Sequence, residues 1–274
     1  MERNRSGAMH AVAFKGALTS ATSYAALTVI TDSIFASAST TGVFVPAGMR
    51  LVGVYLAGIG TSYLGRGRVN AASLLEVAYP SIRPIQLTLG STASPPNFQY
   101  LIDRPLLFPN NDVIGIDAAL RLGDGVSGTT IAYGLLFFLD NPSPVPRGAA
   151  FWLRGVARAA AVSAADVWSG ITIVWDTTLP PGEYAAIGMD HNAVPTLAAN
   201  AVQPIAGRFI FPGQSYRPGV MSATNPAYKA PDAFYQGDFG VLGTFSSYAP
   251  PSLEVICDTT AQAEHEVYLR VIKL

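Results

Sequence analysis

The sequence predicts an all-β protein made of two tandem β-sandwiches, and three observations support this prediction. Many runs of about 5–10 residues are rich in Val, Ile, Leu, Phe, Tyr and Thr, and each ends at Pro, Gly, Asn or Asp. Helical periodicity is almost absent. Similar features also recur in the two halves of the 274-residue chain at nearly constant spacing.

Each β-rich run is expected to form one strand, and one helix is expected among them. The alanine-rich segment Val156 to Val167, VARAAAVSAADV, favours a helix because alanine has the highest intrinsic helix propensity. The strands are expected near residues 9–16, 23–35, 42–58, 70–78, 84–89, 98–108, 112–120, 129–139, 149–156, 167–176, 182–189, 195–200, 205–211, 237–246, 252–257 and 264–273.

The best candidate for a domain boundary is the segment LDNPSPVPRGAA at 139–150. Its three closely spaced prolines cannot continue a central strand and favour a stiff connector. We therefore expect one domain at residues 1–143 and a second at 144–274. The turn sequences Pro46-Ala-Gly48 and Pro180-Pro-Gly182 lie 134 residues apart, which suggests one β-domain used twice.

The low charge of the chain predicts self-association. Charged residues make up 13% of the sequence, against about 25% in an ordinary soluble domain. No run of about 18 uncharged apolar residues offers a membrane span. Burial of the exterior against other copies is the remaining explanation. The net charge of −1 gives no global attraction to nucleic acid, so no sequence-specific nucleic-acid binding is expected.

No catalytic, cofactor-binding or metal-binding residue is expected. Cys257 is the only cysteine, which excludes an intrachain disulfide and a cysteine-based zinc site. His10, His191 and His265 fall in three different elements. Asp190-His191-Asn192 is expected to be a turn, and Glu264 and Glu266 should face away from His265. The carboxylates Asp176, Glu183 and Asp190 form no specific pattern.

The proline-rich segment 212–236 is predicted to be an interface loop, because long structureless loops in compact domains are usually functional. We expect the loop to pack against a neighbouring copy. Its candidate anchors are of residue types enriched in interface cores, namely Tyr216, Arg217, Tyr228 and Phe234.

Two modules of about 135 residues each, a proline-rich join and the stretch RFIFPGQSYRPG at 208–219 resemble a double jelly-roll major capsid protein of tailless icosahedral viruses and phages. The resemblance implies two jelly rolls, trimers that form pseudo-hexagonal capsomers, self-assembly into an icosahedral shell, and location in the virion. Minor capsid proteins and an internal membrane are further partners that the family implies. The chain lacks a basic arm, and the resemblance carries over no catalytic residue, so no enzyme is expected.

Two alternatives remain at this point. A carbohydrate-binding or adhesive β-sandwich protein would need aromatic platforms on one sheet face, and Trp152, Trp168 and Trp175 are close enough in sequence to supply them. A cupin-like enzyme would need clustered histidine ligands, which the scattered histidines disfavour.

Overall fold

The structure is a computed structural model of the chain. It describes residues 8–19, 22–32, 34–60, 64–72, 81–82, 85–87, 99–100, 105–121, 130–161, 165–195, 204–222, 239–258 and 262–274. These residues form β-strands, turns and connecting segments, and no α-helix occurs among them. The all-β expectation is therefore confirmed for this part of the chain.

The chain divides into two compact units. The N-terminal unit is Val12–Phe138, and the C-terminal unit is Leu139–Leu274 together with the residues up to Ala11. The domain boundary expected from the sequence placed residues 8–11 in the first domain. Their contacts group them with the C-terminal unit. The strand β1 (Ala8–Leu18) thus supplies its first residues to the C-terminal unit.

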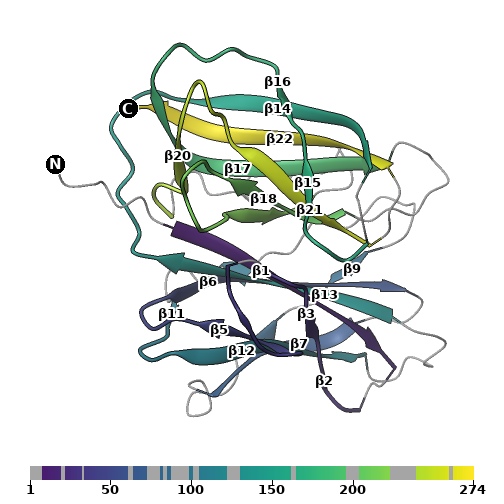
Figure 1. The fold of residues 1–274 in the computed structure, drawn as a ribbon. Coiled ribbons are helices and arrows are strands. Elements are labelled where there is room, and N and C mark those ends of the chain that lie inside the picture. The colour runs from purple at the N-terminus through teal and green to yellow at the C-terminus, as the bar shows by residue number, and fades with distance from the viewer. Residues whose placement is uncertain are drawn as a thin grey trace. The chain divides into compact units, whose positions relative to one another are not determined.

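The N-terminal unit contains two sheets, drawn in Figure 1 as separate layers. One sheet has the order β10-β6-β13-β1-β3, with β9 and β11 also paired to β6. The other has the order β4-β5-β12-β7-β8, with β2 paired to β12. The remaining strands are β2 (Ala25–Ala26), β3 (Thr28–Val29), β4 (Ser37–Ser39), β5 (Gly42–Val45), β6 (Arg50–Gly60), β7 (Leu64–Ala71), β8 (Ser81–Ile82), β9 (Ile85–Leu87), β10 (Gln99–Tyr100), β11 (Leu106–Leu107), β12 (Asp112–Leu120) and β13 (Thr130–Asp140).

The C-terminal unit also contains two sheets, with the orders β16-β14-β22-β17-β20 and β15-β21-β18-β19. In this article they are called the β14 sheet and the β18 sheet. Both are antiparallel throughout their described pairs. Their strands are β14 (Ala150–Ala161), β15 (Ser169–Ile171), β16 (Val174–Trp175), β17 (Glu183–Pro195), β18 (Pro204–Ile210), β19 (Gly219–Met221), β20 (Gly243–Ser246), β21 (Ser252–Cys257) and β22 (Gln262–Lys273).

The two sheets of each unit face one another across an apolar core. In the N-terminal unit, a Cβ atom on Gly134 of β13 would lie 2.4 Å from Ile116 of β12 in the opposite sheet. In the C-terminal unit, the ring of Trp175 on β16 stacks against Phe209 on β18, with centroids 6.4 Å apart. The phenylalanines at 137, 138, 209 and 211 are fully buried. Burial of apolar side chains between the sheets is the main source of stability.

The two units arrange their strands in the same order. In each, the first long strand pairs with the last, and the last pairs with the strand that follows the proline-glycine turn: β1-β13-β6 and β14-β22-β17. In the other sheet of each unit, the next-to-last strand lies between two earlier strands, as β5-β12-β7 and β15-β21-β18. Pro46 and Pro180 therefore precede corresponding strands, and Gly48 and Gly182 both have positive φ.

The expected helix at Val156 to Val167 is wrong for the described residues. Strand β14 continues to Ala161 and pairs with β22, with Val156 opposite Glu266 and Ala157 opposite His265. Helix propensities differ among ordinary residues by only a few tenths of a kcal/mol. Pairing with the central strand β22, which resumes at Ala160 after a shift in register, outweighs so small a preference.

Candidate functional site

A polar cluster of the C-terminal unit lies on the outer face of the β18 sheet, the face that points away from the β14 sheet. On β18, Phe209 points toward the β14 sheet and Gly207 packs under His191 of that sheet, so the intervening Arg208 points the other way. Arg208 lies directly opposite Glu254 on β21 and opposite Gly219 on β19. The register of three strands thus brings a cation and an anion together.

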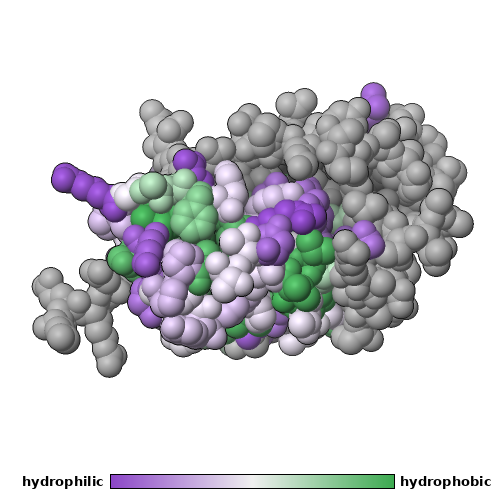
Figure 2. All heavy atoms as spheres, turned by 90° about the horizontal axis from the view of Figure 1, so that it is seen from above, coloured by the Kyte–Doolittle hydropathy of each residue, from purple (hydrophilic) through white to green (hydrophobic). Residues whose placement is uncertain are grey.

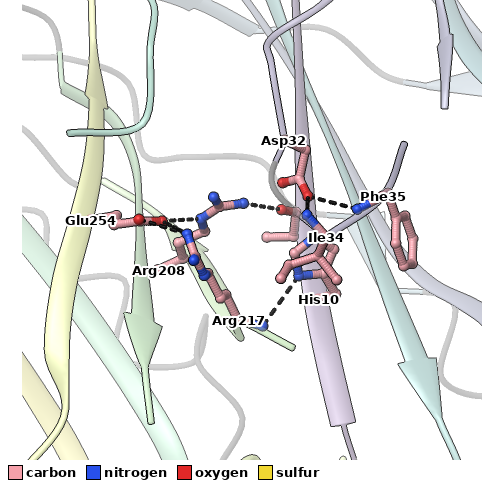
Figure 3. A network of polar contacts seen from close by, with 8 residues as sticks. His10, Asp32, Ile34, Phe35, Arg208, Arg217 and Glu254 are labelled. Atoms are coloured by element: carbon pink, nitrogen blue, oxygen red, sulfur yellow. Dashed lines mark hydrogen bonds and ion pairs between the residues drawn. The ribbon is translucent and has the colours of Figure 1, made fainter. Parts of the chain in front are cut away.

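The guanidinium of Arg208 is held on several sides, as Figure 3 shows. Its Nε donates to Glu254 Oε2 at 2.7 Å, and its Nη1 donates to the carbonyl oxygen of Ala11 at 3.3 Å. Its Cζ lies 4.0 Å from the ring centroid of Trp168, in cation–π geometry. Only 1% of Arg208 is exposed. A charge this deeply buried requires such compensation, because its desolvation is costly.

A second arginine completes the group, which we call the arginine cluster: Arg208, Arg217, Glu254, Trp168, the imidazole of His10 and the backbone of Ala11. Arg217 Nη1 donates to both oxygens of Glu254 at 2.6 Å. Its backbone N–H donates to His10 Nδ1 at 3.1 Å, and its carbonyl accepts from the N–H of Ala11 at 3.1 Å. The cluster therefore fastens the beginning of β1 to the C-terminal unit.

The cluster includes one candidate anchor of the loop at 212–236. Arg217, which was expected to anchor a contact with a neighbouring copy, pairs with Glu254 of its own chain, and its contact with another copy stays a prediction. Tyr216 lies beside His10, with ring centroids 6.0 Å apart, and burial followed by the charge of Asp140 raises its pKa. Tyr228 and Phe234 lie outside the described residues. No local sequence signal marks Arg208 or Glu254, because the pair arises from strand register.

Two histidines meet in the interior of the C-terminal unit. His191 on β17 and His265 on β22 stack with ring centroids 5.3 Å apart, and His191 Nε2 lies 3.1 Å from His265 Nδ1. Ser222 Oγ lies 2.7 Å from His191 Nδ1. The two imidazoles are 0% and 1% exposed. Burial, and secondarily the neighbouring His265, holds the pKa of His191 well below its usual range, while burial lowers the pKa of His265 to about 4.

This pair was missed by the sequence analysis. The histidines do lie in separate strands, but residues 190–192 form part of β17 and not a turn. In the β17–β22 register, Ala193 lies opposite His265 and His191 opposite Val267, so both imidazoles project from the same face. The expectation that Glu264 and Glu266 face away from His265 agrees with this register. The contact between the two histidines could be predicted only from the register of β17 and β22.

The opposite, outer face of the β14 sheet carries an exposed charged group. Arg154 donates to Glu266 and contacts Asp176 at 3.3 Å, and Tyr268 donates to Glu266 at 2.6 Å. Its hydrogen bonds, first the one to Glu266 and then those with Tyr268 and Asp176, raise the pKa of Arg154 above its already high value. Nearly half of the Arg154 side chain is exposed, so these contacts contribute little to stability.

The three tryptophans do not form a shared platform. Trp152 is 46% exposed and lies edge-on to Tyr268, with ring centroids 6.4 Å apart. Trp175 stacks on the buried Phe209, and Trp168 lies against Arg208. A carbohydrate-binding face would require several exposed rings on one sheet surface. These three rings have different surroundings, so the arrangement does not meet that requirement.

An uncharged groove of about 370 Å³ opens at one edge of the C-terminal unit. Its lining consists of Gly170, Ile171, Thr172, Ile173, Trp175, Ile210, Pro250, Pro251, Ser252 and Leu253. Nearby in sequence, Val174 is 70% exposed and Tyr248 80% exposed. On the face drawn in Figure 2, hydrophobic residues likewise gather in separate areas among hydrophilic ones. The surface of this unit thus exposes apolar side chains to water.

Cys257 and Arg68 lie where they support the fold. Cys257 is buried, and burial followed by Asp258 raises the pKa of its thiol to about 12. Arg68 pairs with Asp117 at 2.9 Å and lies over the ring of Tyr24. Over the described ranges, no three His, Cys, Asp or Glu side chains gather as a metal site would require. No helix there has the length and apolar character to cross a membrane.

Comparison with known proteins gave one structural likeness. No family model matches the chain, and no curated protein matches it. Among solved structures, the chain is similar to the crystal structure of the major capsid protein P2 from bacteriophage PM2, with 12% sequence identity and a TM-score of 0.21. The match covers 95% of this chain and 97% of that one.

Proposed function

We propose that this chain is the major capsid protein of a tailless icosahedral virus or phage, and that it self-assembles as trimers into a shell. Its two units are proposed to be jelly rolls, and its place is in the virion. Its role is structural, without catalysis. The observation that carries the proposal is the recurrence of one strand order in two successive units of a single chain.

The strand order supports the jelly-roll assignment. An eight-stranded jelly roll interleaves two Greek keys, so that the first strand pairs with the last and the second with the next-to-last. The C-terminal unit has β14 beside β22 and β15 beside β21. The N-terminal unit has β1 beside β13 and β5 beside β12. Viral capsid proteins, lectins and cupins use this architecture, and fold alone does not choose among them.

Site chemistry favours the capsid among these classes. A cupin-type metal site would need clustered ligands, and the described histidines form only a buried pair. A lectin-type face would need shared aromatic platforms, and the three tryptophans do not provide one. A subunit of a closed shell instead needs two large surfaces that other copies cover. The 13% charge content and the exposed apolar groove agree with that need.

Geometry explains why two units would serve a shell. A trimer of chains with two similar units each presents six similar bodies around one axis, which gives an approximately hexagonal tile. Such tiles cover a closed surface efficiently. The proposed partners are therefore other copies of the chain, followed by minor capsid proteins or an internal membrane. Sequence-specific nucleic-acid binding is not proposed, because the chain carries a net charge of −1.

Sedimentation velocity and negative-stain microscopy of the purified chain test the proposal. We expect trimers or larger particles at micromolar concentration, with hexagonal outlines in the images. A concentration series separates specific assembly from aggregation, because a closed oligomer keeps one sedimentation coefficient while aggregates broaden. A compact 28.8 kDa monomer throughout the series would overturn the proposal.

A further inference from the structure

The imidazoles of His191 and His265 have no described ionic partner that could stabilise an added proton. They are in direct nitrogen-to-nitrogen contact at 3.1 Å, and this contact needs one ring to donate and the other to accept. Ser222 occupies the second nitrogen of His191. Among the described residues, the Nε2 atom of His265 has no hydrogen-bond partner. The neutral pair is therefore compatible with the site, whereas a charged one is poorly compensated.

The strands packed around the pair offer no carboxylate on the inward side. On β17, Asp190 and Asn192 alternate with His191 and face outward, and on β22, Glu264 and Glu266 alternate with His265 in the same way. On β18, Gly207 packs under His191, while Arg208 faces the opposite side and pairs with Glu254. The described titratable side chains on inward faces are the Cys257 thiol on β21 and the Tyr184 phenol on β17.

Space around the pair is also filled. A Cβ atom on Gly207 would lie 2.7 Å from His191 Nδ1, so the backbone of β18 already approaches the ring as closely as a glycine permits. A new charge on this edge of the ring would therefore lie directly against the β18 backbone. The energetic cost of a charge on this pair is therefore expected to fall only if β17 and β22 move away from β18.

We propose that the His191–His265 pair makes the C-terminal unit acid-labile, so that protonation of the pair separates the β14 sheet from the β18 sheet. The device acts on the packing of one unit and does not depend on the capsid role. In a shell, it would let mild acid loosen the subunits from within while their outer surfaces stay unchanged.

The sign of the pH dependence follows from proton binding. In the unfolded chain, a histidine takes up its proton as the pH falls through 6.5, whereas folded His265 stays neutral down to about 4. Between these values the unfolded state binds more protons, so the free energy of unfolding falls as the pH falls. For His265 alone, the unfolding equilibrium constant should rise roughly 30-fold between about pH 7.5 and about pH 5. His191 should add to this effect.

Urea unfolding of the full chain over this pH range tests the proposal, with His265→Asn as the key variant. Asparagine keeps a polar atom near the Nδ1 position but cannot take up a proton. The matched control is Met189→Leu, which changes a buried side chain of β17 without removing a titratable group. We expect the wild type and Met189→Leu to share the steep pH dependence, and His265→Asn to lose roughly 30-fold of it. Equal pH dependence in all three proteins would overturn the proposal.

A measurement on the unchanged protein covers the case in which His265→Asn does not fold. Hydrogen–deuterium exchange at the imidazole C2 position, read by mass spectrometry, reports the protonation of each histidine separately. We expect His191 and His265 to titrate well below 6.5 in the folded chain. Titration of both rings near 6.5 without loss of structure would show that the site tolerates the charge, and would refute the proposed device.

Discussion

Replacing Glu254 by Gln should destabilise the C-terminal unit strongly, because it removes a carboxylate that contacts both Arg208 and Arg217. The substitution keeps the size and shape of the side chain. Arg208, at 1% exposure, would retain the Ala11 carbonyl and the face of Trp168 but lose the charge of Glu254. Two guanidinium groups would also remain close together without a shared anion.

The expected loss can be bounded from the contacts. Removing one partner of a buried ion pair typically costs about 3–5 kcal/mol. The remaining cation–π contact contributes about 1–2 kcal/mol whether or not Glu254 is present, so it does not offset the loss. We therefore expect Glu254→Gln to lower the free energy of unfolding by about 3 kcal/mol or more. With a urea dependence of about 2 kcal/mol per molar, the unfolding midpoint should fall by roughly 1.5–2.5 M.

Urea unfolding followed by circular dichroism and tryptophan fluorescence measures this midpoint. The matched control is Glu266→Gln, which removes the carboxylate of the exposed Arg154 pair on the same unit. That pair is open to solvent, so its loss should move the midpoint far less. A Glu254→Gln midpoint no lower than that of Glu266→Gln would show that the arginine cluster does not need its carboxylate.

Three further outcomes are expected. Arg217→Ala should lower the unfolding midpoint of the isolated chain by circular dichroism, because its partner Glu254 is intrachain; an unchanged midpoint with weakened assembly would support the original interface expectation. Phe209→Ala should cost about 3–5 kcal/mol by calorimetry, since the ring is fully buried between Trp175 and Phe211, and a loss below about 1 kcal/mol would contradict this packing. Exhaustive dialysis against EDTA should leave the midpoint and sedimentation unchanged; a stoichiometric transition metal by elemental analysis would contradict this.

The sequence was most informative where a strand has a long apolar or alternating run. Strands β12, β21 and β22 were predicted within about two residues, because apolar or β-branched residues continue along each and Pro, Gly, Asn or Asp interrupts them nearby. Strand β7 was placed too late in the sequence. Its Gly65, Arg66, Gly67 and Arg68 hide the pattern, since the arginines and glycines occupy alternating positions. The expected helix failed because ladder pairing with β22 outweighs alanine propensity.

The polar groups of the site could not be predicted for a different reason. Arg208 and Glu254 are 46 residues apart, and His191 and His265 are 74 apart. Whether such residues meet depends on which strands are neighbours and on their register, since a slip of one residue sends every side chain to the opposite face. A local run of residues reveals neither which strands are neighbours nor their register. Composition, in contrast, could indicate the need for covered surface without knowledge of any contact.

The attachment of residues 8–11 to the C-terminal unit has a consequence for the order in which the molecule matures. The Ala11 carbonyl and the Arg208 guanidinium that it accepts from are 197 residues apart, with the whole N-terminal unit between them. Bringing such distant residues together costs about 5 kcal/mol of loop entropy in an unfolded chain, and much less once the intervening unit has folded. The contact between Ala11 and Arg208 can therefore form only after β18 has been made. Earlier folding of the N-terminal unit lowers the entropy cost of bringing Ala11 to Arg208.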